Sequence, residues 1–333
     1  MSQTIGVLGA GSWGTALAVH LARTGHAVRL WARDASLAAA MAGSRENVTY
    51  LPGITLPADL RPTGDVAEAL DGAEFVVTAV PSHGLREVAR TASRHLPRAC
   101  AIVSATKGLE AGSLLRMSEV LRSELRDAGE IIALSGPSFA AELARELPTA
   151  LVAAGESAAV VEAVMAHFRS PCLRLYGSAD VVGVELGGSL KNIIAIAAGV
   201  VEGLGVGHNA LAALITRGLA ELSRLAVAQG AQRETLAGLA GLGDLVLTCT
   251  GDLSRNRKVG IELAHGQSLA TILGSTRMVA EGVRTTEAAL ALGARHGIEL
   301  PIAREMSDVL AGRTDPQTAI RNLMGRKQKL EHA

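Results

Sequence analysis

The feature that most constrains this chain is a glycine-rich stretch near its start, Gly9-Ala10-Gly11-Ser12-Trp13-Gly14. It follows a short apolar run at residues 4–8, typical of a buried strand, and precedes residues 15–22, which predict a helix. In such a unit Gly9 permits the tight turn, Gly11 lets the backbone approach a pyrophosphate, and Gly14 lets the helix pack on the strand. The N–H groups of the first helical turn favour the anion. The stretch therefore predicts a dinucleotide site, with a purely structural turn as the alternative in a chain of 37 glycines.

Length and composition leave room for two domains with aliphatic cores. The chain has 333 residues, of which 48% are hydrophobic but only 2% aromatic, so its cores must be built from Ala, Val, Leu and Ile. Lys+Arg and Asp+Glu balance at 32 each. No overall charge therefore draws the chain to nucleic acid or to an anionic membrane, and basic residues must act locally.

The cysteines and the apolar runs bear on where the protein works. Cys100, Cys172 and Cys249 are widely spaced and form no C-x-x-C pattern, which argues against a disulfide framework or a zinc site and fits a reducing cytoplasm. The start of the chain enters the first predicted strand directly, so we expect no signal peptide. The longest apolar run, residues 193–201, is too short to span a bilayer. We expect a soluble cytoplasmic protein without a membrane span.

Strands and helices alternate through the first half of the chain. Further strands are predicted at residues 27–31, 75–80, 100–105 and 131–134, with two more candidates at 150–152 and 173–175. The proline-rich stretch 51–62 is expected to be loop or edge structure. Repeated strand–helix units predict an α/β fold, a Rossmann-type doubly wound parallel sheet spanning residues 1–180. From residue 181 to 333, Ala/Leu/Ile segments with helical spacing predict an all-helical second domain.

Ligands of open α/β sheets bind beyond the carboxyl ends of the strands. Three strand ends of this sequence carry suggestive groups, namely Pro81-Ser82-His83, Lys107-Gly108 and Gly136-Pro137-Ser138. Lys107 follows a predicted strand and could reach a phosphate or a carbonyl oxygen, although a solvated loop lysine is the better interpretation of that residue alone. Gly136-Pro137-Ser138 follows another strand. It could begin a helix whose N–H groups face an anion, or it could be a simple helix start.

Lys191 lies on a predicted helix among very small residues. Its neighbours on the same face, three, four or seven positions away, are Gly187, Gly188, Ala195 and Ala198. This bare strip must be approached closely by another element, which would desolvate the ammonium and lower its pKa. We favour proton exchange with an alcohol or carbonyl as the role of Lys191. The alternative is a lysine that snorkels out of a tight helix contact.

Two further stretches carry polar groups next to helix starts. Asp244 follows a glycine turn and precedes an apolar run, so it could cap a helix, orient Lys191 or accept from a substrate hydroxyl. Ser254, Arg255 and Asn256 open another helical stretch that continues into Arg257 and Lys258. Two arginines and an amide in one first turn favour a phosphate site over a solvated basic face.

Taken together, these stretches resemble the bacterial NAD(P)-dependent glycerol-3-phosphate dehydrogenases. They cover nearly the whole chain in the expected order: GAGSWGTALA, LWARD, VPSH, ATKGLE, SGPSFAAELA, PTA, GVELGGSLKNIIAIAAG, NALAALITRGLAE, AGLGDLVLTCT, SRNRKVG and AEGVRT. The resemblance implies reversible reduction of dihydroxyacetone phosphate to sn-glycerol 3-phosphate, the backbone precursor of glycerophospholipids. It also implies a Rossmann-type domain followed by a helical domain, with Lys191 as proton donor and acceptor.

The resemblance also implies the remaining site residues. The catalytic pair would be Lys191 and Asp244. The substrate contacts would be Lys107, Gly136, Ser138, Lys191, Asp244, Ser254, Arg255 and Asn256. The cofactor contacts would be Ser12, Trp13, Arg33, Lys107, Ala140, Arg255, Val279 and Glu281, in addition to the three glycines of the turn. The sequence departs from the family at Trp13, where Tyr or Phe is frequent, and at Arg33, where His is common.

Arg33 bears on the choice of cofactor. It lies nineteen residues beyond Gly14, at the end of the second predicted strand, where an acidic residue would accept from the ribose 2′-OH of NAD. A guanidinium there can bind a 2′-phosphate, so we expect NADPH to be preferred and NADH tolerated. If Asp34 turned inward instead, NADH would be favoured; we expect Asp34 to cap the following helix.

Two other functions fit part of the pattern. A dehydrogenase of the 3-hydroxy-acid type shares the two-domain plan and a helical lysine, and Ser254-Arg255-Asn256 could bind its carboxylate. A non-catalytic redox sensor would bind dinucleotide alone and would have no use for Lys191 beside a second anion site. No metal cluster or nucleophilic triad is visible in the sequence, and the choice between a monomer and a homodimer stays open.

Overall fold

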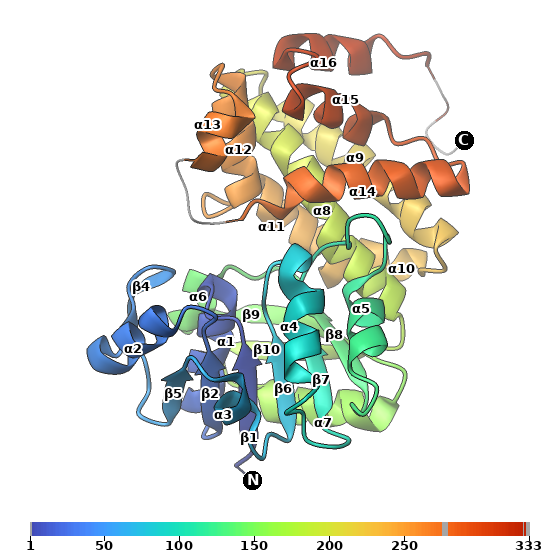
Figure 1. Cartoon of the computed structure of the whole chain (residues 1–333). Helices are drawn as coiled ribbons and strands as arrows, with labels where there is room; N and C mark the ends of the chain where they lie inside the picture. Colours follow the sequence, from blue (N-terminus) through green and yellow to red (C-terminus); the bar gives the residue numbers. More distant parts are fainter. Residues whose placement is uncertain (1, 275–278, 329, 331–333) are drawn as a thin grey trace.

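An eight-stranded sheet forms one half of the molecule, and a group of helices forms the other half (Figure 1). The computed structural model describes residues 2–274, 279–328 and 330. The sheet has the order β10-β9-β8-β7-β6-β1-β2-β5. Its strands are β1 Thr4–Leu8, β2 Ala27–Trp31, β5 Leu60–Thr63, β6 Phe75–Thr78, β7 Ala101–Ser104, β8 Ile131–Ser135, β9 Thr149–Ala154 and β10 Leu173–Ser178.

Helices cover the sheet because its strands are apolar on both faces. β8, for example, is buried at every residue, as expected for a strand between two layers. The aliphatic composition fills the two cores on either side, in which Phe75 and Phe168 are the buried phenylalanines. The elements between the strands are α1 Ser12–Arg23, α2 Ala35–Ser44, α3 Val66–Leu70, η1 Ser82–Gly84, α4 Leu85–Ala92, α5 Met117–Glu124, α6 Ala140–Ala144 and α7 Ala158–Phe168.

The structure confirms the predicted α/β class, and the proline-rich stretch does lie at an edge. β5 is the edge strand beside β2, and β4 (Leu51–Thr55) pairs with β3 (Glu46–Asn47) in a separate small ribbon. Edge positions tolerate proline because one side of the strand needs no ladder hydrogen bonds. Pro62 of β5 and Pro52 of β4 both occupy such strands.

The expectation of a wholly parallel sheet is wrong at one place. β8 and β9 are antiparallel, with Leu134 opposite Ala153, whereas every other neighbouring pair in this sheet is parallel. The connection between β8 and β9 holds only the five-residue helix α6. A parallel return usually passes through a full-length crossover helix, which α6 does not supply, whereas an antiparallel return needs none. β9 and β10 therefore run against the other six strands.

The second half of the described chain is helical, as predicted, and no strand is assigned after Ser178 in the described ranges. Its elements are α8 Val181–Gly203, α9 His208–Ala228, α10 Arg233–Ala237, the π-turn η2 Leu239–Gly243, α11 Asp244–Thr250, α12 Arg255–Ala264, α13 Leu269–Gly274, α14 Glu281–His296, α15 Pro301–Leu310 and α16 Pro316–Met324. The other long helices pack around α8, which runs through the centre of this half (Figure 1).

α8 joins the two halves. It begins on the face of the sheet, where Val184 packs with Ala133 of β8 and Ala154 of β9. Further along, Gly199 faces α12 so closely that a Cβ atom there would lie 1.9 Å from the Arg257 carbonyl oxygen. Asp180 caps the helix by accepting from Gly183 N at 2.8 Å. The domain division at residues 180 and 181 stays a prediction from the sequence, and it falls at this cap.

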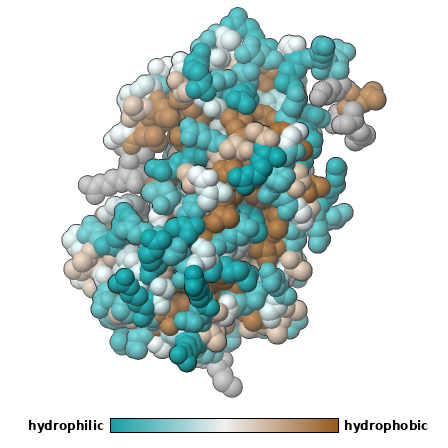
Figure 2. Space-filling view, turned by 45° about the vertical axis from the view of Figure 1, so that its right-hand side comes forward, coloured by the Kyte–Doolittle hydropathy of each residue, from teal (hydrophilic) through white to brown (hydrophobic). Residues whose placement is uncertain are grey.

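The length of α8 corrects the estimate made from the apolar run alone. The helix has 23 residues, and the mean hydropathy of its most apolar window is 1.5, enough by length and composition to cross a membrane. However, 83% of its most apolar window is buried inside the protein, as in a core helix. Figure 2 shows hydrophobic surface mainly in the middle and upper part of one face, while the lower lobe is mostly hydrophilic.

Candidate active site

The glycine turn has the geometry that a phosphate-binding turn needs. Gly9 adopts a φ of 116°, and a Cβ atom there would lie 2.6 Å from the Ala79 carbonyl oxygen. A Cβ atom on Gly14 would lie 1.9 Å from the Gly9 carbonyl oxygen, so α1 packs directly on the turn. By contrast, a Cβ atom on Gly11 would meet nothing within 4 Å. The first turn of α1 holds no acidic residue and opens on this space, which suits an anion.

A buried carboxylate shared by two lysines lies at the same edge of the sheet. Asp244, 1% exposed, accepts from Lys191 Nζ through Oδ1 and from Lys107 Nζ at 2.6 Å through Oδ2. Lys191 Nζ also donates to Thr248 Oγ1 at 2.7 Å. Lys107 follows β7, Lys191 lies on α8, and Asp244 and Thr248 lie on α11. Because β1, β6, β7 and β8 are parallel, this cluster and the glycine turn occupy the same side of the molecule.

The small residues beside Lys191 admit the elements that build this cluster. A Cβ atom on Gly187 would lie 2.6 Å from the Ala240 carbonyl oxygen, so η2 passes directly over α8 and delivers Asp244 at the start of α11. A Cβ atom on Gly188 would lie 2.3 Å from Ser135 Oγ, at the end of β8. The close approach expected from the sequence therefore exists, and it encloses Lys191, which is 6% exposed.

Burial controls the protonation of the central lysine. Desolvation lowers the pKa of Lys191 from 10.5 to about 8, with the Lys107 charge acting in the same direction and Asp244 opposing both. An ammonium with a pKa near neutrality can both give and take a proton under ordinary conditions. The neighbouring Cys249 behaves differently, because burial raises the pKa of its thiol to about 12 and keeps it neutral.

The stretch after β8 is arranged differently from the predicted helix start. Gly136 has a φ of 141°, and its carbonyl oxygen accepts from Lys107 Nζ at 3.2 Å and from Ser138 Oγ at 3.0 Å. The next helix, α6, begins only at Ala140 and has five residues, so Pro137 is not in its first turn. The interpretation of Gly136-Pro137-Ser138 as a helical anion site is therefore wrong. The glycine instead presents a carbonyl oxygen that holds Lys107 beside Asp244.

The predicted phosphate turn opens α12, and of its two arginines Arg255 has no side-chain partner in the described part of the chain. Ser254 caps the helix by accepting from Arg257 N at 3.2 Å. The Asn256 amide donates to Asn192 Oδ1 at 2.9 Å and accepts from Gly282 N at 3.0 Å. Arg257 forms two bonds of 2.6 Å with Glu202.

The two arginines of this turn need no anion to relieve their repulsion, because Glu202 neutralises Arg257 from a helix 55 residues away in sequence. Arg255 is exposed as a residue, and among the described residues no hydrogen bond or ion pair holds its guanidinium. Neighbouring groups desolvate the guanidinium and lower its pKa, while the Glu281 charge opposes this shift. Arg255 is thus the cation of this turn that is available to a ligand.

The remaining predicted cofactor residues surround the glycine turn and the α14 start. Ser12 and Trp13 begin α1 and Ala140 begins α6, all partly buried. The Trp13 indole Nε1 is buried and has no hydrogen-bond partner within the described part of the chain. Val279 precedes α14 and is partly buried. Glu281 begins α14 and accepts from Ser82 N at 3.0 Å and from Ser82 Oγ at 2.6 Å, which ties the helical half to the end of β6.

Arg33 and Asp34 lie just beyond β2. Asp34 caps α2, as expected, by accepting from Ser36 N at 2.9 Å. Arg33 is exposed. A carboxylate committed to a helix cap leaves Arg33 as the charged group that is free to face a ribose.

Sequence reasoning missed several residues of this site. Thr248 supports Lys191 and could have been found, because it lies four positions after Asp244 and thus on the same helical face. Ser82 lies in the strand end Pro81-Ser82-His83, which the sequence does single out, but neither its contact nor that of Asn192 was predicted. Their partners, Glu281 and Asn256, are 199 and 64 residues away in sequence.

The glycine turn, the doubly wound sheet and the buried lysine on a helical second half place the chain among two-domain dinucleotide-dependent dehydrogenases. The models for the N-terminal and C-terminal parts of NAD-dependent glycerol-3-phosphate dehydrogenase match residues 4–161 and 180–321. The chain therefore belongs to the NAD-dependent glycerol-3-phosphate dehydrogenase family.

Individual relatives agree along the whole chain. The glycerol-3-phosphate dehydrogenase (NAD(P)+) of Citrifermentans bemidjiense is 51% identical over 333 residues, covering 99% of both chains. That of Koribacter versatilis is 50% identical over 331 residues and 98% of both chains. The crystal structure of glycerol-3-phosphate dehydrogenase from Coxiella burnetii is 40% identical and superposes with a TM-score of 0.94, covering 98% of this chain and 99% of that one.

We predict that Lys191→Ala abolishes measurable turnover while cofactor still binds, since a general acid–base group contributes about 10²–10⁴-fold. Lys191→Arg is the matched control for charge, because it keeps a cation beside Asp244 but cannot release a proton. Steady-state kinetics and cofactor titration by fluorescence check both variants. With a Lys191 pKa of about 8, carbonyl reduction should weaken above that pH and alcohol oxidation should strengthen. Near-normal kcat in either variant would remove Lys191 from the acid–base role.

We predict that Arg255→Ala raises the KM for dihydroxyacetone phosphate by about ten- to a hundredfold, because charge-assisted contacts are worth about 1.5–3 kcal/mol each. The phosphate-free analogue dihydroxyacetone should be affected much less. Lys258→Ala is the matched control, since it removes an exposed cation from the same helix. Equal losses for both substrates would assign Arg255 a structural or cofactor role.

Proposed function

We propose that this chain catalyses the reversible reduction of dihydroxyacetone phosphate to sn-glycerol 3-phosphate with NAD(P)H. The observation that carries the proposal is the buried Asp244 carboxylate that holds Lys191 and Lys107 at the carboxyl edge of the sheet. Membership of the family supports the same reaction. In the cell, this activity would supply the glycerol backbone of glycerophospholipids.

Each side chain of the cluster has a distinct task in this proposal. Lys191 donates a proton to the carbonyl oxygen during reduction and takes it back during oxidation, which its lowered pKa permits. Asp244 orients Lys191 and compensates the two ammonium groups. Lys107 reaches the substrate oxygens or the cofactor from the opposite side of Asp244. Arg255, with Ser254 and Asn256 in the same turn, holds the phosphate.

The described residues fit a dinucleotide, which supplies the hydride when it is bound. The open space above Gly11 and the acid-free first turn of α1 accommodate a pyrophosphate. Trp13, Ala140, Val279 and Glu281 line the approach to it in this proposal. The helical half then excludes water from the reacting atoms.

We also propose a cytoplasmic location and a homodimeric assembly. All three cysteines are free, and Cys100 and Cys249 are buried, which suits a reducing compartment. Sedimentation velocity would test the homodimer directly.

Purified protein mixed with NADPH and dihydroxyacetone phosphate should lose nicotinamide absorbance, and the reverse mixture should gain it. A 3-hydroxy-acid dehydrogenase would instead respond to 3-hydroxy acids, and a redox sensor would bind NADPH without turnover. Either result would overturn the proposed substrate. Lys191→Ala supplies the control for contaminating activity.

We predict that Arg33→Ala raises the KM for NADPH far more than that for NADH, because the guanidinium pairs with the 2′-phosphate that NADH lacks. The wild-type protein should prefer NADPH and tolerate NADH. Arg61→Ala, at an exposed arginine of the adjacent strand β5, is the matched control. A wild-type preference for NADH, or equal losses for both cofactors, would show that Asp34 or the glycine turn sets the choice.

A further inference from the structure

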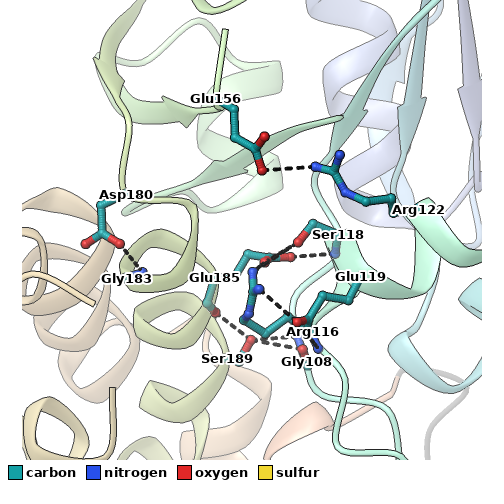
Figure 3. Close-up of polar contacts among 10 residues, drawn as sticks. All are labelled: Gly108, Arg116, Ser118, Glu119, Arg122, Glu156, Asp180, Gly183, Glu185 and Ser189. Atoms are coloured by element: carbon teal, nitrogen blue, oxygen red, sulfur yellow. Dashed lines mark hydrogen bonds and ion pairs between the residues drawn. The ribbon is translucent and has the colours of Figure 1, made fainter. Parts of the chain in front are cut away.

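The segment that carries Lys107 is fastened to α8 at two points (Figure 3). It runs from the end of β7 to the start of α5, residues 105–116, and we call it the Lys107 segment. Both fastening residues, Glu185 and Ser189, lie on α8 upstream of Lys191. The helix that presents one lysine of the cluster therefore also holds the segment that presents the other.

Glu185 forms the first fastening point at the far end of the segment. Glu185 is 8% exposed, and its carboxylate accepts from Arg116 at 2.6 Å, from Ser118 N at 2.7 Å and from Ser118 Oγ at 2.6 Å. Arg116 also pairs with Glu119 at 3.0 Å. Burial raises the pKa of Glu185, and the Arg116 charge opposes that rise. A carboxylate this deeply buried needs its whole set of partners to remain charged.

Ser189 forms the second fastening point, next to Lys107 itself. Its hydroxyl accepts from Gly108 N at 2.9 Å and donates to the Glu185 carbonyl oxygen at 2.6 Å. Gly108 has a φ of 146°, and a Cβ atom there would lie 2.5 Å from Ser82 Cβ. The backbone after Lys107 is thus packed between η1 and α8. Ser189 Oγ, which also lies 3.2 Å from the Gly108 carbonyl oxygen, fixes its position along the helix.

The middle of the segment is closed on itself and braced from outside. Glu110 N donates to the Leu115 carbonyl oxygen at 2.9 Å, and Leu109 bridges to Arg116. Arg86 of α4 makes two bonds of 2.7 Å to the Glu110 carboxylate. The segment is therefore a compact unit, so a displacement at Arg116 or Gly108 moves Lys107 with it.

We propose that Ser189 and the Glu185–Arg116 pair are positioning residues that set Lys107 against Asp244, and through Asp244 set Lys191. The proposal rests on the proposed function, because it assumes that both lysines serve the reaction. Ser189 is two positions before Lys191 on α8, so one helix fixes both ammonium groups to the same reference. Without these contacts, Lys107 would move away from Asp244 Oδ2, and Asp244 would then pair with Lys191 alone.

The test measures the protonation of Lys191 in the resting enzyme. The sequence holds the lysines Lys107, Lys191, Lys258, Lys327 and Lys329, so a protein labelled with ¹³C at lysine Cε gives few resonances. Lys191→Arg and Lys107→Arg assign the two that matter. The charged and titratable groups that act on Lys191 are Asp244, Lys107 and Cys249. Of these three groups, Lys107 is the one that would move away from Lys191 if the segment were loosened.

In Ser189→Ala and in Glu185→Gln we expect the Lys191 titration midpoint to move above its wild-type value, because the repelling Lys107 charge retreats and water enters. We expect kcat for dihydroxyacetone phosphate reduction to fall by about ten- to a hundredfold, with the KM for cofactor little changed. The alkaline limb of the kcat profile should move upward with the titration.

Glu221→Gln is the matched control, because Glu221 is also a buried carboxylate that accepts from two backbone N–H groups, those of Ile302 and Ala303. It should lower thermal stability while leaving the Lys191 titration and kcat unchanged. Arg122→Ala controls for exposed charge near α5, since its pair with Glu156 is exposed. Arg116→Lys keeps a positive charge beside Glu185. It should therefore retain part of the wild-type Lys191 titration and kcat only if charge alone suffices to hold the segment.

A folded Ser189→Ala protein with wild-type Lys191 titration and wild-type kcat would overturn the proposal, even if Glu185→Gln failed to fold. The titration needs no substrate, so it judges the positioning role whichever substrate the enzyme takes. If the wild-type protein did not reduce dihydroxyacetone phosphate, that result would instead overturn the proposed function.

Discussion

The site depends on one carboxylate placed between two ammonium groups. Asp244 gives one oxygen to Lys191 and the other to Lys107, and it is 1% exposed. Without it, the buried Lys191 would lie beside the half-buried Lys107 with no counter-charge, and repulsion would favour loss of the Lys191 proton. One carboxylate compensates only part of the two positive charges. Asp244 and the two lysines together therefore keep a net positive charge at the carboxyl edge of the sheet. Such a charge attracts a phosphorylated substrate and polarises a carbonyl oxygen.

Small residues make that arrangement sterically feasible. Asp244 reaches Lys191 because η2 crosses α8 at Gly187, where any side chain would strike the Ala240 carbonyl oxygen. The same close backbone contact recurs where Gly199 and Gly260 let α8 and α12 touch. The low content of aromatic residues and the high content of glycine and alanine both permit this close packing of helices. Helices approach until their backbones meet, and polar side chains fill the few remaining spaces.

Local patterns predicted the parts of the structure that depend on neighbours in sequence. The strand–turn–helix unit around Gly9, the helix cap at Asp34 and the small-residue face around Lys191 all follow from spacing within one or two turns. The parts that escaped depend on distant partners. Glu202 neutralises Arg257 across 55 positions, and Lys107 meets Asp244 across 137. The reversal of β9 also escaped, because apolar strands have the same pattern whether they run parallel or antiparallel.

That reversal has a mechanical consequence. Because β9 and β10 run against the other strands, the chain leaves β10 on the side away from the site, and α8 must climb the face of the sheet before it reaches Asp244. The first turns of α8 pack on Ala133 and Ala154, so the helix that carries Lys191 is anchored on the sheet. The boundary in sequence at residue 180 is therefore not a hinge. If the later helices moved relative to the sheet, they would move around α8, while Lys191 would keep its position relative to Ala133 and Ala154.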